Sequence, residues 1–334
     1  MTSRLLPRLR FLLLAALLAV APAFAVTVPD LYEVAMPVAA SRDAAFVDAL
    51  KVVVVRVSGR RDAAVRLGGA LNNPRQYVQR FGFTADNVLQ VGFDSVSVDK
   101  LLTDAGLPVW GRERPATLVL LNVQATDGSS YWIDSAASTV EREAISRAAK
   151  QRGLPIIWPE MTTQDRTQIN AGVDASADPS ALLQAAARYN ANAALLGTAR
   201  TDGAGGLSVR WTLASDDGAA SAAGSLEEGV NLAADTFARV YSASGTTLDS
   251  VMVEVSGIGN LGAYATTLNY LEGMTLVRGV AVEQVLGDTL RFKLAIRGDA
   301  TTLRRALALD GKLVPLAPAD AAAPVDRLQF QYQP

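Results

Sequence analysis

The sequence predicts a multi-domain protein that mixes α/β and α+β architecture. The chain has 334 residues, half of them apolar, which is enough for two or three domains with cores of their own. Between residues 116 and 245, a β-α-β-α-β order followed by antiparallel strands indicates a small mixed-sheet α/β domain. Between residues 246 and 316, a β-α-β-β-α-β order indicates a ferredoxin-like domain.

The first 25 residues are typical of a secretory signal peptide. Three arginines precede an apolar run over residues 11–20, and Ala23-Phe24-Ala25 is a small-residue cleavage site. The apolar run is shorter than the roughly 20 residues that a membrane-spanning helix needs. We therefore expect cleavage after Ala25 and a periplasmic mature chain, beginning at Val26, without a transmembrane segment.

Residues 26–115 are predicted to form an amino-terminal α/β domain. Ser41 is a good N-cap for a helix with apolar residues at helical spacing, ended by Gly59. The consecutive valines of residues 52–55 also suit a buried strand, but the helical spacing is preferred. Asn73-Pro74 predicts the start of a second helix, with Tyr77, Val78 and Phe81 as its apolar face. A strand over 31–37 and a helix over 96–105 complete the domain.

Residues 116–245 are predicted to form the mixed-sheet domain. The run from Ser138 to Glu141 reads as a capping box for a helix ending at Arg152, and Asp178-Pro179 caps the next helix. This order is similar, at the level of the fold, to mixed α/β domains of envelope proteins such as the amino-terminal domain of TolB and the penicillin-binding-protein activators. The expected strands cover 117–123, 154–158, 193–201, 207–214 and 219–226; the expected helices cover 138–152, 178–189 and 231–242.

Residues 246–316 are predicted to form the ferredoxin-like domain, and residues 317–334 a flexible tail. The tail prediction rests on its Ala- and Pro-rich composition. The expected strands of the domain cover 251–255, 277–286, 290–296 and 313–316, and its expected helices cover 261–271 and 301–309.

Four runs of the chain, VRVSGRRDAAV, LNNPRQYVQRFGF, LLTDAGLPVWGRERPATLVLL and RGLPIIWP, carry a family resemblance. Together they resemble an uncharacterised family of exported proteobacterial proteins, domain-of-unknown-function family 2066, from about Leu31 to Tyr241. The family carries no established activity. The resemblance therefore implies a gram-negative envelope context and supplies no catalytic residue.

The composition excludes several classes of chemistry. The chain has no histidine and no cysteine, so it cannot build His-based catalytic pairs, Cys or His zinc sites, or disulfides. Carboxylates remain as acid–base groups, but the adjacent pairs Asp216-Asp217 and Glu227-Glu228 read as solvated turns, because neighbours on an extended chain point in different directions. We expect no enzyme and no bound metal.

One glycine motif matches a dinucleotide fingerprint. Gly257, Gly259 and Gly262 follow a predicted strand and open a helix, and Glu283 stands where a ribose-binding acid could lie. A predicted hairpin, rather than further alternating β-α units, follows that helix. We therefore interpret the glycines as a tight turn and expect no cofactor.

Five residues are candidates for partner contacts. Tyr131 and Trp132 lie in a predicted loop, where exposed aromatic side chains can anchor a partner; the alternative is that Trp132 plugs the edge of the domain core. Trp110, with Arg112 and Arg114, is either a plug between two domains or an exposed aromatic residue beside cations.

The charge balance bears on the partners. A net charge of −2 argues against nucleic acid. Residues 41–80 carry eight basic and three acidic side chains, which form either a docking face for an anionic envelope component or an ordinary surface paired with acids elsewhere; the second is preferred. The leading hypothesis is a non-catalytic periplasmic adaptor that binds other envelope proteins. The alternatives are a small-ligand-binding protein with a cleft between its first two domains and a carboxylate-dependent hydrolase.

Overall fold

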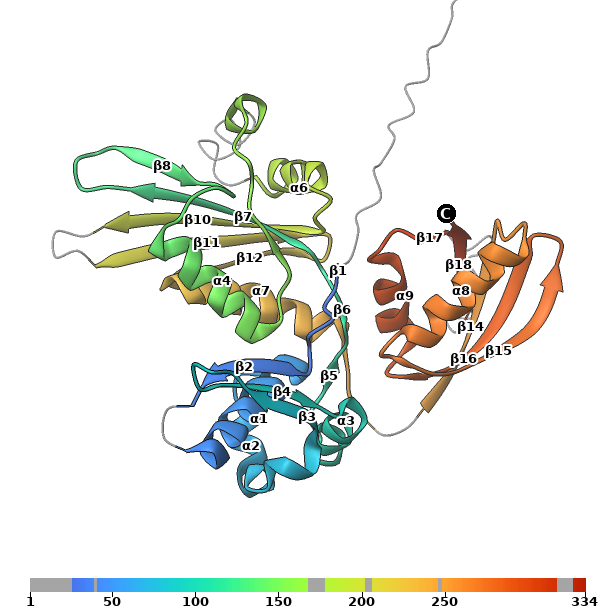
Figure 1. Ribbon diagram of the computed structural model, residues 1–334. Coiled ribbons are helices and arrows are strands. Elements are labelled where there is room, and N and C mark those ends of the chain that lie inside the picture. Colours follow the sequence, from blue (N-terminus) through green and yellow to red (C-terminus); the bar gives the residue numbers. More distant parts are fainter. Residues whose placement is uncertain (1–25, 39–40, 168–177, 202–205, 246–247, 317–326) are drawn as a thin grey trace, which may run out of the picture.

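The computed structural model describes residues 26–38, 41–167, 178–201, 206–245, 248–316 and 327–334 (Figure 1). Within them, the longer strands form a three-stranded, a six-stranded and a five-stranded sheet, and separate clusters of buried apolar side chains underlie the three sheets. The predicted multi-domain mixture of α/β and α+β architecture is confirmed. The predicted signal peptide lies outside the described residues.

The amino-terminal unit is a three-stranded antiparallel sheet with one long helix on one face. Ser41 accepts a hydrogen bond from the backbone N–H of Ala44, and Gly59 ends the helix in the left-handed conformation, so the predicted α1 is confirmed. The sheet order is β2-β4-β3. The elements are β2 (Glu33–Pro37), α1 (Arg42–Ser58), α2 (Ala63–Leu67), η1 (Gly68–Leu71), η2 (Pro74–Tyr77), β3 (Val78–Phe83), β4 (Val88–Phe93) and α3 (Ser95–Asp104).

The helix predicted from Asn73-Pro74 is wrong beyond its first turn. Pro74 opens only the four-residue 3-10 helix η2, and the chain then enters β3. The reason is tertiary packing, since Phe81 and Phe83 of β3 both stack edge-on against the buried ring of Phe46 on α1. An alternating strand places both rings on the same face, which a helix would not.

The middle unit is a mixed sheet with helices on both faces. Its order is β12-β11-β10-β7-β8, with β9 also paired to β7; β7 runs parallel to β10 and to β9. Helices α4 and α7 cover one face, and α6 covers the other (Figure 1). The elements are β7 (Thr117–Gln124), β8 (Ser130–Ile133), α4 (Val140–Arg152), β9 (Ile156–Ile157), α6 (Pro179–Arg188), β10 (Ala193–Thr201), β11 (Leu207–Ser215), β12 (Gly218–Gly224) and α7 (Leu226–Tyr241).

Two boundaries in this unit differ from the prediction. Residues 130–133 form the edge strand β8 rather than a loop, because they pair with the end of β7. Helix α7 begins at Leu226, five residues before the expected start, although it contains Gly229. A Cβ atom at Gly229 would overlap the buried indole of Trp211, so the glycine serves close packing rather than ending the helix.

The carboxyl-terminal unit has the predicted β-α-β-β-α-β order and one further strand. Helices α8 and α9 lie on one face of a sheet with the order β15-β16-β14-β18-β17 (Figure 1). The elements are β14 (Leu248–Ser256), α8 (Leu261–Gly273), β15 (Val277–Leu286), β16 (Thr289–Arg297), α9 (Ala300–Ala308), β17 (Leu313–Pro315) and β18 (Arg327–Tyr332).

The predicted flexible tail is wrong for residues 327–332. These residues form β18, which inserts between β14 and β17 and runs parallel to β14. The side chains of Leu328 and Phe330 are buried in the core of this unit. The Ala- and Pro-rich composition of the preceding segment concealed the alternating pattern of β18, and the extra strand makes the sheet a variant of the predicted ferredoxin-like arrangement.

Short ladders join the units. β5 (Val109–Trp110), at the end of the amino-terminal unit, pairs with β13 (Ser242–Ala243), which follows α7. β1 (Val26–Thr27) pairs with β6 (Glu113–Arg114). In the part of the chain that the structure describes, none of the helices combines the length and the apolar character needed to cross a membrane.

Candidate functional site

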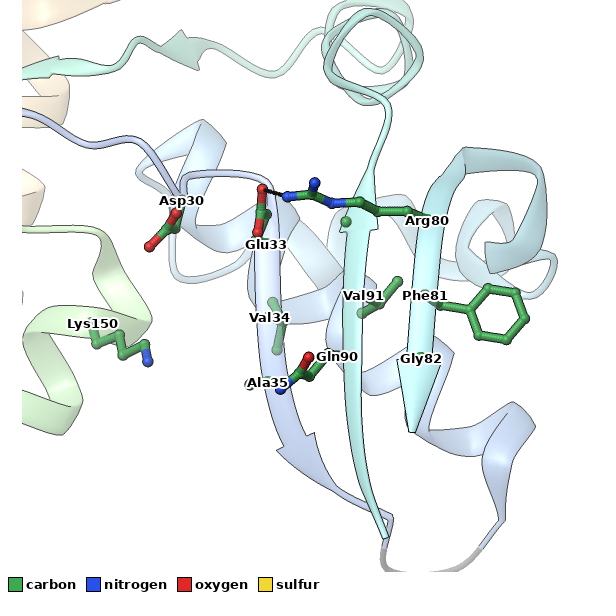
Figure 2. A pocket seen from close by; sticks show the side chains of 11 residues that line it. Asp30, Glu33, Val34, Ala35, Arg80, Phe81, Gly82, Gln90, Val91 and Lys150 are labelled. Carbon is green, nitrogen blue, oxygen red and sulfur yellow. Dashed lines mark hydrogen bonds and ion pairs between the residues drawn. The ribbon is translucent and has the colours of Figure 1, made fainter. Parts of the chain in front are cut away.

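A groove lies on the face of the amino-terminal sheet opposite α1 (Figure 2). Its volume is about 430 Å³, and its floor contains the small residues Ala35, Gly82 and Gly92. Lys150 of α4 contributes the remaining wall, so the groove lies between the first two units of the chain. The ring of Phe81 points away from it, toward Phe46.

Charged side chains of both signs surround the groove. Arg80 forms an ion pair with Glu33, and its stem lies across Gly92, where a Cβ atom would be 3.1 Å from Arg80 Cγ. The carboxylate of Asp30 and the Nζ atom of Lys150 have neither a hydrogen bond nor an ion pair with any described residue, whereas the backbone carbonyl of Asp30 accepts a hydrogen bond from Arg56 at 3.0 Å. The groove therefore offers one ammonium and one carboxylate group without a direct side-chain partner, although the charge of Asp30 also acts on the buried Arg56.

Two of the predicted contact residues, Trp110 and Arg114, are completely buried. The guanidinium carbon of Arg114 lies 3.8 Å from the centroid of the Trp110 ring. Of the two alternatives for this pair, the structure shows the plug between units. Neither side chain reaches the surface in this conformation.

Arg114 is held entirely by backbone carbonyl groups. It donates five hydrogen bonds of 2.8 to 3.0 Å, which use all five of its N–H groups. Burial, followed by the neighbouring Arg56, lowers the pKa of Arg114 well below its usual value. The acceptors are the carbonyl oxygens of Arg56, Trp110, Gly111, Arg152 and Gly153.

These carbonyls include the ends of two helices from different units. Arg56 lies in the last turn of α1, and Arg152 and Gly153 end α4. Cations stabilise helix C-termini because the last carbonyl groups carry partial negative charge. The Arg114 guanidinium therefore ties the amino-terminal unit to the middle unit.

A second buried arginine strengthens this joint. Arg152 donates to the carbonyl oxygen of Gly59 at 2.7 Å and to the carboxylate of Asp235 on α7 at 2.6 Å. Sequence reasoning missed Arg56 and Arg152, because the sequence of an amphipathic helix does not distinguish a buried arginine from an arginine on the surface.

The other three predicted contact residues lie in different places. Arg112 is half-buried, lies over the ring of Tyr32 and donates from its backbone N–H to Thr275 of the carboxyl-terminal unit. On β8, Tyr131 is 46% exposed, whereas Trp132 packs against the cluster beneath α6. Trp110 belongs to the cluster on the opposite face of the same sheet. The structure therefore does not bring the five residues into one site.

Asp99 is a further buried acid that sequence reasoning missed, and it connects the first and third units. It accepts a hydrogen bond from Tyr32 at 2.7 Å and forms ion pairs with Arg278 at 3.2 Å and Arg297 at 3.8 Å. Burial, then the charge and hydrogen bond of Asp99, raise the pKa of Tyr32. The chain position of Asp99, on the predicted helix over 96–105, gave no sign that its two arginine partners lie 179 or more residues further along the chain.

The basic segment over residues 41–80 is largely paired with acids. Arg60 with Asp62 and Arg75 with Asp43 are ion pairs inside the segment. Arg61 pairs with Glu228 and Asp235, and Arg80 with Glu33. The segment is therefore an ordinary surface whose charges are largely paired.

The glycine fingerprint forms a turn, as interpreted. Gly257 has a φ of +84°, and a Cβ atom there would overlap the side chain of Gln331 on β18. Gly259 has open space around it, and Asn260 caps α8. The close contact at Gly257 is therefore with β18, a strand of the same unit.

A family model described as "Domain of unknown function (DUF8605)" matches residues 25–111. This family differs from family 2066, whose resemblance stays an expectation. No curated protein matches the chain. The solved structure of the LpoB C-terminal domain from Salmonella enterica has 13% sequence identity and a TM-score of 0.21, covering 33% of this chain and 82% of that one. At this score the likeness supports no conclusion about fold or function.

Proposed function

We propose that the mature chain is a non-catalytic adaptor of the gram-negative cell envelope, which works in the periplasm and binds other envelope proteins. The proposal of export rests on the signal-peptide pattern of residues 1–25. The observation that carries the adaptor role is the pair of buried polar joints at Arg114 and Asp99, which hold three units in one arrangement.

Rigid joints matter because domains in one chain otherwise move relative to each other by default. Arg114 and Arg152 fix the first unit to the second through carbonyl groups and Asp235, and Asp99 fixes the third unit to the first. A frame of this kind keeps surfaces on separate units at constant distances, which is what an adaptor needs to hold two partners together.

Export is tested by cell fractionation. We expect the protein in the osmotic-shock fraction, with Val26 as its first residue by amino-terminal sequencing. An intact amino terminus in the cytoplasmic fraction would contradict the envelope location and, with it, the adaptor proposal.

Partner binding is tested by crosslinking in living cells. A photoreactive amino acid is placed at the exposed Tyr131 and, as a matched control, at the exposed Val140 on α4. We expect one envelope protein to crosslink at Tyr131 and to return this chain in the reciprocal capture, with much less product at Val140. If Tyr131 and equivalent exposed positions on the other two units, Phe81 and Val285, gave no reproducible partner, the adaptor role would be rejected.

The groove favours a second candidate function, the binding of a small polar ligand. The free Lys150 ammonium and Asp30 carboxylate suit a molecule with one negative and one positive group, such as an amino acid or a peptide end. Native mass spectrometry of protein isolated from the periplasm should then show a bound small molecule. Lys150→Gln should lose it, whereas Lys100→Gln, on the exposed pair with Asp104, should retain it. If both variants carried the small molecule in equal amounts, the groove would not be its binding site.

A further inference from the structure

The outer edge of β12 has no partner among the described strands. β12 is the first strand of the six-stranded sheet and pairs only with β11. The pairing is regular over seven residues, from Gly218 opposite Ser215 to Gly224 opposite Val209. Every second residue of such an edge strand points its backbone N–H and C=O groups outward, where they can accept another strand.

The other described edges carry the features that usually prevent strand addition. β15 has register shifts that leave Arg278 and Glu283 as additional, charged residues. β3 has a shift between Val78 and Arg80, and β2, at the other edge of that sheet, begins with the charged Glu33 and ends at Pro37. β17 has three residues and ends at Pro315, and β8 has four residues. Bulges, charges, proline and short length all protect edges, and β12 has none of them.

The sequence of β12 is also the same in both directions. It reads Gly-Ala-Ala-Ser-Ala-Ala-Gly, with Ser221 at its centre. A two-fold axis pairs a surface with itself, so an antiparallel pair about Ser221 places serine opposite serine, alanine opposite alanine and glycine opposite glycine. No charge and no large side chain meets an unlike neighbour anywhere in this register.

We propose that β12 pairs antiparallel with β12 of a second copy of this chain, with the two-fold axis at Ser221. The free backbone edge carries the inference, and the self-complementary register selects a second copy as the occupant. The side chains of β12 are exposed or half-exposed and small, so the second strand can approach to the usual spacing of about 4.8 Å. The two six-stranded sheets then become one continuous sheet.

Acidic side chains set the strength of this pairing. Asp216 and Glu227 are exposed beyond the two ends of β12, and the two-fold axis brings the acidic ends of the copies toward each other. Arg305 and Arg61 offset the neighbouring acids Asp217 and Glu228, and Arg147 acts on Glu227. Because salt screens exposed like charges, we expect the dimer to tighten as ionic strength rises.

The absence of cysteine from the chain permits a test of register as well as of association. Ser221→Cys places two thiols opposite each other at the axis, where opposed Cβ atoms are about 5 Å apart. Oxidised glutathione takes two electrons and two protons from the thiols and leaves as two reduced molecules, so a disulfide-linked dimer should accumulate. Ala219→Cys is the matched control, because its thiols would be four residues apart along the strand, roughly 13 Å.

The unmodified protein provides the second measurement. We expect sedimentation equilibrium to show a concentration-dependent dimer that Ser221→Lys weakens at least tenfold. At concentrations low enough for the protein to be monomeric, the melting temperature should be unchanged, because Ser221 is exposed. The proposal is overturned if the protein stays monomeric at every concentration and salt level. It is also overturned if Ala219→Cys crosslinks as readily as Ser221→Cys. The adaptor proposal is unaffected by either result.

Discussion

Arg114 shows why a residue type can be required at one position. Its five N–H groups donate hydrogen bonds to five carbonyl oxygens from both units. A lysine ammonium has only three donors and lacks the planar geometry, so it cannot make the same set of bonds. Nothing apolar could replace it either, since the carbonyls that end α1 and α4 would then lose their donors in a dry interior.

We therefore predict that Arg114→Lys lowers the free energy of unfolding by about 3 kcal/mol or more, the range seen when a buried charged contact is broken. Arg112→Lys is the control, because the half-buried Arg112 side chain lies over Tyr32 and ends no helix. Urea unfolding of both variants is the measurement. If both variants lost a similarly small amount of unfolding free energy, the hydrogen bonds from Arg114 to the backbone carbonyls would contribute little to stability.

Trp110 fills the same joint with its ring, but its Nε1 atom has no hydrogen-bond partner. Trp110→Ala should therefore cost about 3 to 5 kcal/mol by emptying a large buried site. Trp110→Phe keeps much of the ring and removes the unpaired N–H group, so its melting temperature should lie much closer to that of the unaltered protein. If alanine left the melting temperature unchanged, Trp110 would not be a structural plug.

The sequence indicated that the run from Trp110 to Arg114 lies between two domains, but it did not indicate which groups Arg114 contacts there. The aromatic residue, the arginines and the flanking prolines are visible in one line of sequence. The acceptors are backbone carbonyls of residues up to about sixty positions away, and backbone atoms leave no signature in the residue letters. That is also why Arg56 and Arg152 were missed.

Elements with local signals were predicted well. α1 and α6 begin at the side-chain caps named from the sequence, Ser41 and Asp178, and β10 spans the predicted residues. Elements decided by distant packing were not. β3 lies where the sequence predicts a helix, because its ring partner Phe46 is more than thirty residues earlier in the chain. β18 lies where the sequence predicts a tail, because its parallel neighbour β14 is more than seventy residues earlier.

The position of β18 leads to a prediction at the scale of the element. Phe330 is buried in the core of the carboxyl-terminal unit, so Phe330→Ala should destabilise the protein by about 3 to 5 kcal/mol. Gln329→Ala, at the half-buried neighbour on the other face of the strand, should cost far less. Thermal unfolding distinguishes them. If neither substitution changed the melting temperature, residues 327–332 would not be part of the folded core and would be a tail, as the composition of residues 317–334 predicts.

At the scale of the whole molecule, the third unit is attached by polar contacts rather than by a shared apolar core. The apolar clusters of the first and third units have no residue in common, and Asp99 with Arg278 and Arg297 lies between them. Buried charge pairs add little net stability but are costly to break. This arrangement favours one fixed orientation of the units, which is the property that the adaptor proposal needs.

Tyr32 makes this attachment sensitive to alkali. Burial first, then Asp99, raise the pKa of Tyr32 above the value of about 10 that a tyrosine has in an unfolded chain. Below pH 10 both states keep the proton, and the stabilisation is fully present. Above pH 10 the unfolded chain loses its proton first, so stability falls as the pH rises toward the folded-state pKa.

Replacing Tyr32 with phenylalanine should remove this pH dependence. Between pH 10 and 11.5, the free energy of unfolding should decline more steeply for the unaltered protein than for Tyr32→Phe, by up to about 1.4 kcal/mol per pH unit for this one group. The buried Arg56, whose pKa is lowered to about 10, contributes a slope of opposite sign, but it does so equally in both proteins and cancels from their difference. Urea unfolding at half-unit pH steps is the measurement, and pH 8 is the control, where the two slopes should be equal. Parallel curves up to pH 11.5 would mean that water reaches the Tyr32 hydroxyl, and that the contact between the first and third units opens in solution.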